Sequence, residues 1–230
     1  MRKKNGLLFS IILPVYKQES HIVPLLQEFI KGLQKITKQY ELLVIINGPA
    51  SNEYKRLVEF AKPRDFIRVF YLDRAGWGRA VKFGISKAKG RYVCYTNSAR
   101  TNVADLLQML SYSKNNKDVV VKATRIIRES WMRKVGSILY NLENRFLLKT
   151  PVWDVNGTPK VFPKNLLKKI TLDSETDLID AELMVKCFRN HIPILEVPVL
   201  FTKRKGGKST TNLLSAFRMY LGLLGLKKRL

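Results

Sequence analysis

The sequence predicts an α/β protein with a mainly parallel central sheet and helices on both of its faces. Two observations carry this prediction. Short runs rich in β-branched and aromatic residues alternate with longer segments of helical period through the first half of the chain. In addition, 46% of the 230 residues are hydrophobic and 10% are aromatic, which is enough for a packed core and excludes a disordered basic tail. The length suits a single domain with an appendage.

Five strands are predicted from the apolar runs, and each of the first four is followed by a segment of helical period. The first run ends at Pro14, a residue that stops a sheet ladder, and each later run is likewise rich in β-branched or aromatic residues. The expected strands are Leu7–Leu13, Glu41–Ile46, Phe66–Leu72, Tyr92–Thr96 and Val119–Ala123. The expected helices between them are Ser20–Lys35, Ser51–Ala61, Trp77–Lys87 and Val103–Ser113. Ligands of such sheets lie beyond the carboxyl ends of the strands, so the loops after the strands are the candidate site.

The second half of the chain has a looser pattern. Basic helical stretches fill Arg125–Lys149, a turn follows at Asp154–Pro159, and an acidic segment runs from Asp173 to Glu182. A strand ends at Glu196-Val-Pro198, before a basic loop that contains glycine. We therefore expect one domain over residues 1–210, with a nucleotide-binding half (1–124) and an acceptor half (125–210), and a C-terminal helix over residues 211–230.

The charge and the cysteine count exclude several classes of protein. The chain has 42 Lys and Arg against 18 Asp and Glu, a net charge of +24, so a partner with negative charge is expected. Two cysteines and two histidines do not make a disulfide framework or a Cys/His zinc site. The basic first residues lack a small-residue cleavage site, which favours a buried first strand over a signal peptide, and a reducing cytosolic compartment.

The C-terminal segment Leu213–Leu226 is almost wholly apolar and is followed by Lys227-Lys-Arg229. It is too short to span a bilayer, which takes roughly 20 apolar residues. Two interpretations stay open: an amphipathic helix that lies in the membrane interface, or a terminal helix packed on the domain or on another subunit.

Two phosphate-binding motifs are absent. Gly207-Lys208-Ser209 lacks the glycine five positions earlier that a P-loop needs, because Thr202 stands there. Gly76-Trp-Gly78 lacks the third glycine of a dinucleotide fingerprint, because Val81 stands there. The sequence therefore indicates neither a P-loop ATPase nor a Rossmann dehydrogenase.

A series of segments in a fixed order resembles glycosyltransferase family 2 of the GT-A fold, and within it the polyprenyl- or dolichyl-phosphate sugar synthases. The likeness covers nearly the whole chain. Its main segments are Ile11-Ile-Leu-Pro-Val-Tyr16, Tyr40-Glu-Leu-Leu-Val-Ile-Ile-Asn47, Gly76-Trp-Gly-Arg-Ala80, Ala88-Lys-Gly-Arg-Tyr92, Asp154-Val-Asn-Gly-Thr-Pro-Lys160, Glu196-Val-Pro198 and Arg204-Lys-Gly-Gly-Lys-Ser209. Each segment alone is a weak match, but their order and separations together are specific.

The resemblance implies a set of site residues. The candidates for catalysis, taken from the resemblance and from the chemistry of the side chains, are Asn97, Arg100, Asp154, Asp180, Glu182 and Arg204. Those for binding of the donor or acceptor are Pro14, Tyr16, Gln18, Asn47, Gly76, Gly78, Arg79, Ser98, Arg125, Lys160, Lys208 and Ser209. Structural roles compete for several of them: Asp180 and Glu182 also suit the start of a helix, Asp154 suits a turn, and Arg79 suits a solvated helix face.

The chain departs from the family pattern where a metal is usually bound. The Asp-x-Asp that holds a divalent cation and the donor diphosphate falls on Asn97-Ser98-Ala99. Mg²⁺ or Mn²⁺ would therefore lack its usual ligands. We hypothesise instead that Arg100, with Arg125, Lys160 and Arg204, stabilises the leaving diphosphate without a metal, since a guanidinium pairs with phosphate in bidentate fashion.

The resemblance implies transfer of a sugar from a nucleotide-sugar donor to a polyprenyl (dolichyl-type) phosphate, in glycan or cell-envelope biosynthesis. The expected location is cytoplasmic, peripherally on the inner face of an anionic membrane, and an oligomer is compatible with the sequence. Two alternatives stay open: the same fold with a saccharide, lipid or protein acceptor, and a degenerate scaffold without turnover. Nucleic acid is not expected as a partner, because the charge stands without an RNP or helix-turn-helix motif.

Overall fold

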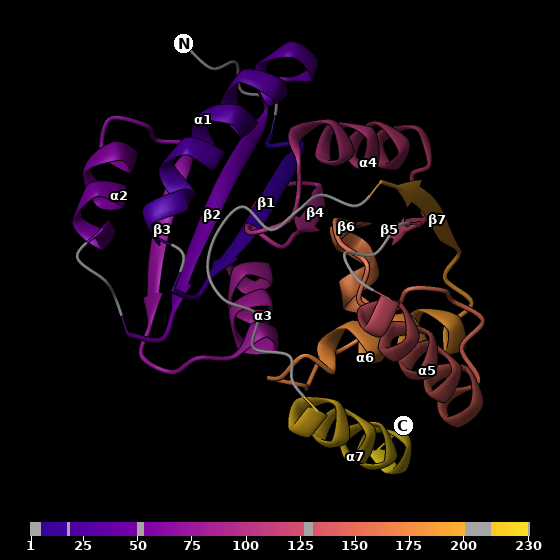
Figure 1. Cartoon of the computed structure of the whole chain (residues 1–230). Coiled ribbons are helices and arrows are strands. Elements are labelled where there is room, and N and C mark those ends of the chain that lie inside the picture. Colours follow the sequence, from indigo (N-terminus) through magenta and orange to yellow (C-terminus); the bar gives the residue numbers. More distant parts are fainter. Residues whose placement is uncertain (1–5, 18, 50–52, 127–130, 201–212, 230) are drawn as a thin grey trace.

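The computed structural model describes residues 6–17, 19–49, 53–126, 131–200 and 213–229, which form a seven-stranded sheet with helices on both faces (Figure 1). The strands are β1 (Phe9–Val15), β2 (Tyr40–Asn47), β3 (Ile67–Leu72), β4 (Tyr92–Tyr95), β5 (Val120–Arg125), β6 (Lys160–Pro163) and β7 (Ile194–Val199). The helices are α1 (Glu19–Ile36), α2 (Glu53–Ala61), α3 (Trp77–Lys87), α4 (Val103–Asn115), α5 (Trp131–Leu148), η1 (Lys164–Lys168, 3₁₀), α6 (Ile179–Arg189) and α7 (Leu213–Arg229).

The strand order is β3-β2-β1-β4-β6-β5-β7. Strands β1 to β4 pair in parallel, as do β5 and β7, whereas β6 runs antiparallel to both β4 and β5. The predicted mainly parallel sheet is thus confirmed. The sequence analysis missed β6, which has only four residues and begins with a charged one.

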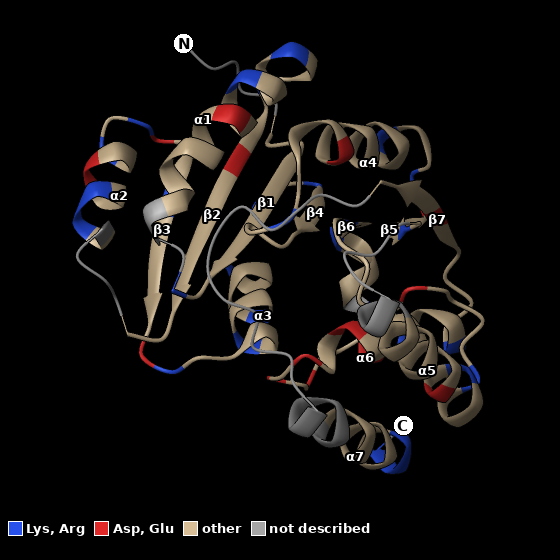
Figure 2. Ribbon diagram, in the orientation of Figure 1, with Lys and Arg blue, Asp and Glu red and all other residues tan. Residues whose placement is uncertain are grey.

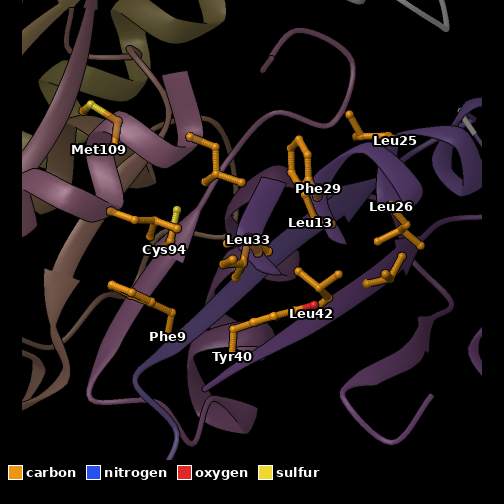
Figure 3. Close-up of a cluster of buried hydrophobic side chains, with 14 of the residues drawn as sticks. Phe9, Leu13, Leu25, Leu26, Phe29, Leu33, Tyr40, Leu42, Cys94 and Met109 are labelled. Carbon is orange, nitrogen blue, oxygen red and sulfur yellow. The ribbon is translucent and has the colours of Figure 1, made fainter. Parts of the chain in front are cut away.

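Each face of the sheet has its own apolar core, because alternate residues of a strand point to opposite faces. In β1, Ile11 and Leu13 belong to the core under α1, α2 and α4, whereas Ile12 belongs to the core under α3 and α6. Figure 3 shows the first core, in which Phe29 and Leu33 of α1 lie over β1 and β2. Both faces of β1 and β2 are buried, which explains why these strands are continuous apolar runs.

The C-terminal helix α7 packs on the domain. It contacts α5, and its Leu223 and Leu226 are buried. A Cβ on Gly222 would lie 2.5 Å from Leu178 Cδ1, so the helix approaches the start of α6 closely. The packed interpretation of this helix therefore holds for one of its faces. A role for α7 at a membrane, and the division of the chain at residues 124 and 210, stay predictions.

Among the described residues, no helix is long and apolar enough to cross a bilayer. The helix predicted from Ser51 and the helical stretch predicted from Arg125 each lie partly outside the described residues. The basic loop over residues 203–211 lies wholly outside them.

Candidate active site

The carboxyl ends of β1, β2 and β4 are tied together by side chains that the sequence analysis assigned to binding. Ser98 Oγ donates to the Pro14 carbonyl at 3.0 Å. Asn47 Nδ2 donates to the Val15 carbonyl at 2.9 Å, and Asn47 Oδ1 accepts from the Gly76 amide at 3.0 Å. Asn47 is buried, so its amide holds the loops after β1 and β3 in place at the edge where ligands of parallel sheets bind.

Tyr16 lies beside this network. A Cβ on Gly48 would be 2.9 Å from Tyr16 Cε2, and Gly48 has φ +106°, a conformation that favours glycine. The ring of Tyr16 therefore packs against the turn that follows β2, with Lys17 Nζ 5.3 Å from its centroid. The ring is half-buried, and its role in a nucleobase site stays a prediction.

The turn after β4 holds the residues that stand where the family has Asp-x-Asp. Asn97 Oδ1 accepts from the Ala99 amide at 3.0 Å, and the Asn97 carbonyl accepts from the amides of Arg100 and Thr101 at 3.1 and 3.0 Å. With Ser98 Oγ donating to Pro14, the turn presents no carboxylate, and divalent cations prefer carboxylate oxygens. Among the described residues, no three His, Cys, Asp or Glu side chains are grouped to hold a metal ion. The side chains present here do not fit the family's metal.

Asp180, at the start of α6, accepts three hydrogen bonds from side chains of other elements. Trp77 Nε1 donates to Oδ2 at 3.0 Å, Tyr95 OH donates to Oδ1 at 2.7 Å, and Lys160 Nζ forms an ion pair with Oδ1. The Asp180 carboxylate and Lys160 are both buried. Tyr95 and Lys160 are paired residues of β4 and β6. The register of these two strands therefore places the Lys160 ammonium beside Tyr95, where both side chains reach the Asp180 carboxylate.

Burial shifts the pKa values of the groups around Asp180. Loss of solvent lowers the pKa of the Lys160 ammonium, although the charge of Asp180 opposes that shift. Burial, with the nearby Asp180 charge, raises the pKa of Tyr95 well above its ordinary value. At neutral pH Tyr95 is therefore a hydrogen-bond donor to Asp180.

Arg125 and Asp154 form a second ion pair at the carboxyl end of β5. Arg125 Nε and Nη2 donate to Asp154 Oδ2 and Oδ1 at 2.8 and 2.7 Å, and the Arg125 amide donates to Oδ2 at 2.9 Å. Asp154 is buried and has φ +46°, so its turn is held in a left-handed conformation. Asp154 thus holds the Arg125 guanidinium through Nε and Nη2.

Lys122 and Glu196 hold the backbone of the residue before Asp154. Lys122 Nζ donates to the Trp153 carbonyl at 2.5 Å and to Glu196 Oε2 at 2.9 Å, and the Trp153 amide donates to Glu196 Oε1 at 2.8 Å. Thr124 Oγ1 also donates to Glu196 Oε2, at 2.6 Å. This pair clamps both polar groups of the Trp153 backbone and so fixes the turn that presents Asp154 to Arg125.

We expect Lys122 to make stability depend on pH. Burial lowers its pKa to about 8, with Glu196 opposing and Lys160 adding to the shift. Between pH 8 and the ordinary lysine value of about 10.4, the unfolded chain binds a proton that the folded chain does not, so the free energy of unfolding rises with pH. The difference between wild type and Lys122→Met in urea unfolding should grow across this window by up to about 3 kcal/mol. A pH-independent difference would contradict the prediction.

Glu182 holds the segment before α6 through hydrogen bonds. Glu182 accepts from the amides of Asp173 and Ser174 at 2.9 and 2.8 Å and from Lys186 Nζ at 2.6 Å. Burial opposes these hydrogen bonds, but they prevail and lower the pKa of Glu182. It thus shapes the segment between η1 and α6.

The same segment covers the start of α3. A Cβ on Gly78 would lie 2.6 Å from the Ser174 carbonyl oxygen, and one on Gly76 would lie 2.9 Å from that of Glu175. Arg79 Nη2 pairs with Glu175 Oε2 at 2.6 Å on the surface. The space beside these two glycines is therefore filled by the backbone of residues 174–176 in this structure.

The structure brings together four predicted residues, Arg125, Asp154, Lys160 and Asp180, in two neighbouring ion pairs. Pro14, Asn47 and Ser98 lie together at the carboxyl ends of β1, β2 and β4, and the Arg100 amide donates to the Asn97 carbonyl of the turn after β4. Sequence reasoning missed Tyr95, Lys122 and Glu196 and gave Trp77 no role. Gln18, Arg204, Lys208 and Ser209 lie outside the described residues. A cavity of about 600 Å³ lies elsewhere, beside the end of α3 and η1, and its described lining includes none of the predicted site residues.

The chain is similar to known glycosyltransferases. The model of the family described as "Glycosyl transferase family 2" matches residues 10–171. An undecaprenyl-phosphate 4-deoxy-4-formamido-L-arabinose transferase from Proteus mirabilis is 27% identical over 135 residues, which cover 57% of this chain and 41% of that protein. A dolichyl-phosphate β-glucosyltransferase from Dictyostelium discoideum is 24% identical over 226 residues, which cover 89% of this chain and 69% of that protein.

Solved structures show the same fold. Glucosyl-3-phosphoglycerate synthase from Mycobacterium tuberculosis, in complex with Mn²⁺, uridine diphosphate and phosphoglyceric acid, superposes with a TM-score of 0.75. It is 15% identical, and the match covers 97% of this chain and 79% of that one. The chain thus has the fold of the GT-A enzymes, as the sequence predicted.

Proposed function

The chain belongs to glycosyl transferase family 2 and is a glycosyltransferase, and we propose that it transfers a sugar from a nucleotide-sugar donor to a polyprenyl phosphate without a metal. The observation that carries the proposal is a set of two ion pairs, the partly exposed Arg125 with Asp154 and the buried Lys160 with Asp180. Lys160 is paired in the sheet with Tyr95, which lies at the end of β4, just before Asn97. The names of both curated relatives, which act on undecaprenyl phosphate and dolichyl phosphate, support this class of acceptor.

The donor diphosphate needs positive charge while negative charge builds on the leaving group. In our proposal Arg125 donates from Nη1 to a phosphate oxygen while Nε and Nη2 stay on Asp154. Arg100 follows the Asn97 turn directly and, in our proposal, supplies a second guanidinium. Tyr16 and the loops that Asn47 holds form the donor side of the site.

The acceptor side needs orientation more than a base. A phosphate monoester oxygen is already ionised near neutral pH, so it attacks the anomeric carbon without losing a proton to the protein. In our proposal Asp180, fixed by Trp77, Tyr95 and Lys160, orients a sugar hydroxyl. Arg204, Lys208 and Ser209 remain proposed contacts to the acceptor phosphate.

The proposed location is the cytoplasmic face of a membrane, with peripheral attachment. A lipid-linked acceptor requires the enzyme to work at a bilayer, and the net charge of +24 favours an anionic surface. Lys227, Lys228 and Arg229 are exposed at the end of α7.

Incubation with radiolabelled nucleotide sugars and membrane extract, followed by organic extraction, tests the proposal. We expect label in the organic phase, and we expect it to persist in EDTA because the Asn97 turn has no carboxylate for a cation. Label confined to the water-soluble fraction would point to a saccharide acceptor. Activity lost in EDTA and restored by Mn²⁺ or Mg²⁺ would contradict metal-independent transfer, and no turnover with any donor would favour the scaffold.

A further inference from the structure

Helix α5 presents large apolar side chains to solvent along one face. Their spacing of four, three and four residues from position 135 to position 146 places them on a single stripe of the helix. These residues, called here the apolar stripe, are Val135, Ile138, Leu139, Leu142 and Phe146. Leu139 is 56% exposed and Phe146 is 89% exposed, and contiguous exposed apolar surface of this kind marks an interaction site.

The other face of α5 carries buried polar residues, so the helix cannot roll to hide its stripe. Asn141 is buried, and its Oδ1 accepts from the Val155 amide at 3.0 Å, next to Asp154. Asn144 is buried, and its Nδ2 donates to the Tyr140 carbonyl at 2.7 Å. The anchor at Asn141 fixes the rotation of α5 relative to the Asp154 turn and keeps the stripe outward.

The surroundings of the stripe are basic. Arg145 lies on α5 and Lys149 follows it, with Arg145 Cζ 4.3 Å from the ring centroid of Trp153, a half-exposed aromatic. Helix α7, which contacts α5, ends in the three exposed basic residues at positions 227–229 (Figure 2). Glu143 is the acidic residue of α5, and burial raises its pKa.

These charges favour an anionic bilayer over a second copy of the chain as the partner of the apolar stripe. Two copies of this chain would bring two net charges of +24 together, which opposes self-association. An anionic bilayer instead supplies apolar depth for the stripe and negative headgroups for the basic residues around it. Trp153, stacked with Arg145, suits the headgroup level, where indole rings gather.

We propose that the apolar stripe of α5 docks on an anionic lipid bilayer, with α5 lying in the plane of the interface. The proposal rests on the proposed function in one respect, since the polyprenyl phosphate would enter from the same bilayer. It differs from the sequence expectation, which gave this role to the C-terminal helix. Because Trp153 precedes Asp154 and Asn141 holds Val155, docking brings the lipid surface next to the Arg125–Asp154 pair.

Vesicle co-sedimentation tests the stripe. The probes are phosphatidylcholine vesicles with and without about one third phosphatidylglycerol, and neither contains polyprenyl phosphate or donor. We expect Leu139→Gln with Phe146→Gln to weaken binding to the anionic vesicles about tenfold or more. The control is Ile36→Gln with Val58→Gln, two exposed apolar side chains on α1 and α2, away from the stripe, and its binding should equal that of wild type.

Unchanged binding of the stripe variant would overturn the proposal. Equal binding of wild type to both kinds of vesicle would also overturn it, because the basic residues around the stripe would then contribute nothing to membrane binding. Concentration-dependent mass in sedimentation equilibrium, abolished by Leu139→Gln, with no vesicle binding would assign the stripe to a second copy. Since no substrate is present, vesicle binding without any lipid-linked product in the transfer assay would contradict the proposed function alone.

Discussion

Asp180→Asn is expected to lower transfer activity by about 10²-fold or more and the free energy of unfolding by about 3–5 kcal/mol. The carboxylate holds Trp77, Tyr95 and Lys160. An amide in its place leaves the buried Lys160 ammonium without an opposite charge. Initial rates and urea unfolding measure the two effects.

The double variant Asp180→Asn with Lys160→Met separates the two effects. Methionine removes the buried unpaired charge and keeps most of the volume, so stability should largely recover. Activity should not recover, because the carboxylate is still absent. A double variant that regains both stability and activity would show that Asp180 serves the fold alone.

Gly157→Ala is expected to destabilise the protein by about 3 kcal/mol or more and to lower the soluble yield. A Cβ at this position would lie 1.9 Å from the Ala123 carbonyl oxygen and 2.9 Å from that of Asp154. Both neighbours are backbone atoms, which cannot move without separating the Asp154 turn from β5. The thermal unfolding midpoint and the yield of soluble protein measure the effect.

Gly136→Ala is the matched control for Gly157→Ala. A Cβ on Gly136 would meet no atom within 4 Å, and the residue lies inside α5. Alanine should therefore leave stability unchanged or raise it by up to about 1 kcal/mol. Equal losses in both variants would mean that the contact with Ala123 does not limit position 157.

The strands and helices of the first half could be predicted because each is long and strongly patterned. Both faces of β1 and β2 are buried, and the helix over Trp77–Lys87 was predicted to the residue. Strand β6 could not be predicted, because Lys160-Val-Phe-Pro163 has no alternation beyond four residues. Its position in the sheet depends on partners 65–71 residues away in β4 and 38–40 residues away in β5.

The site was only partly predictable for the same reason. Asp154 and Lys160 were found through a family resemblance, and Asp180 as a member of the acidic segment, but the pairing of these residues was not found. The partner of each depends on strand register: Lys160 lies opposite Tyr95 in one strand and Lys122 in the other. Only the fold shows that the indole N–H of Trp77 donates to Asp180.

The position of β6 between β4 and β5 also sets an order of assembly on the ribosome. Strands β1 to β4 are adjacent in the sheet and complete by residue 95, so they can pair as soon as they leave the exit tunnel. Strand β5 is made next but reaches the sheet only through β6, whose first residue follows about 35 residues later. At about 5–20 residues per second, β5 waits roughly 2–7 s with its apolar residues unpaired. Unpaired strand edges are prone to misassociation, so we expect chaperones to bind the nascent chain in this interval.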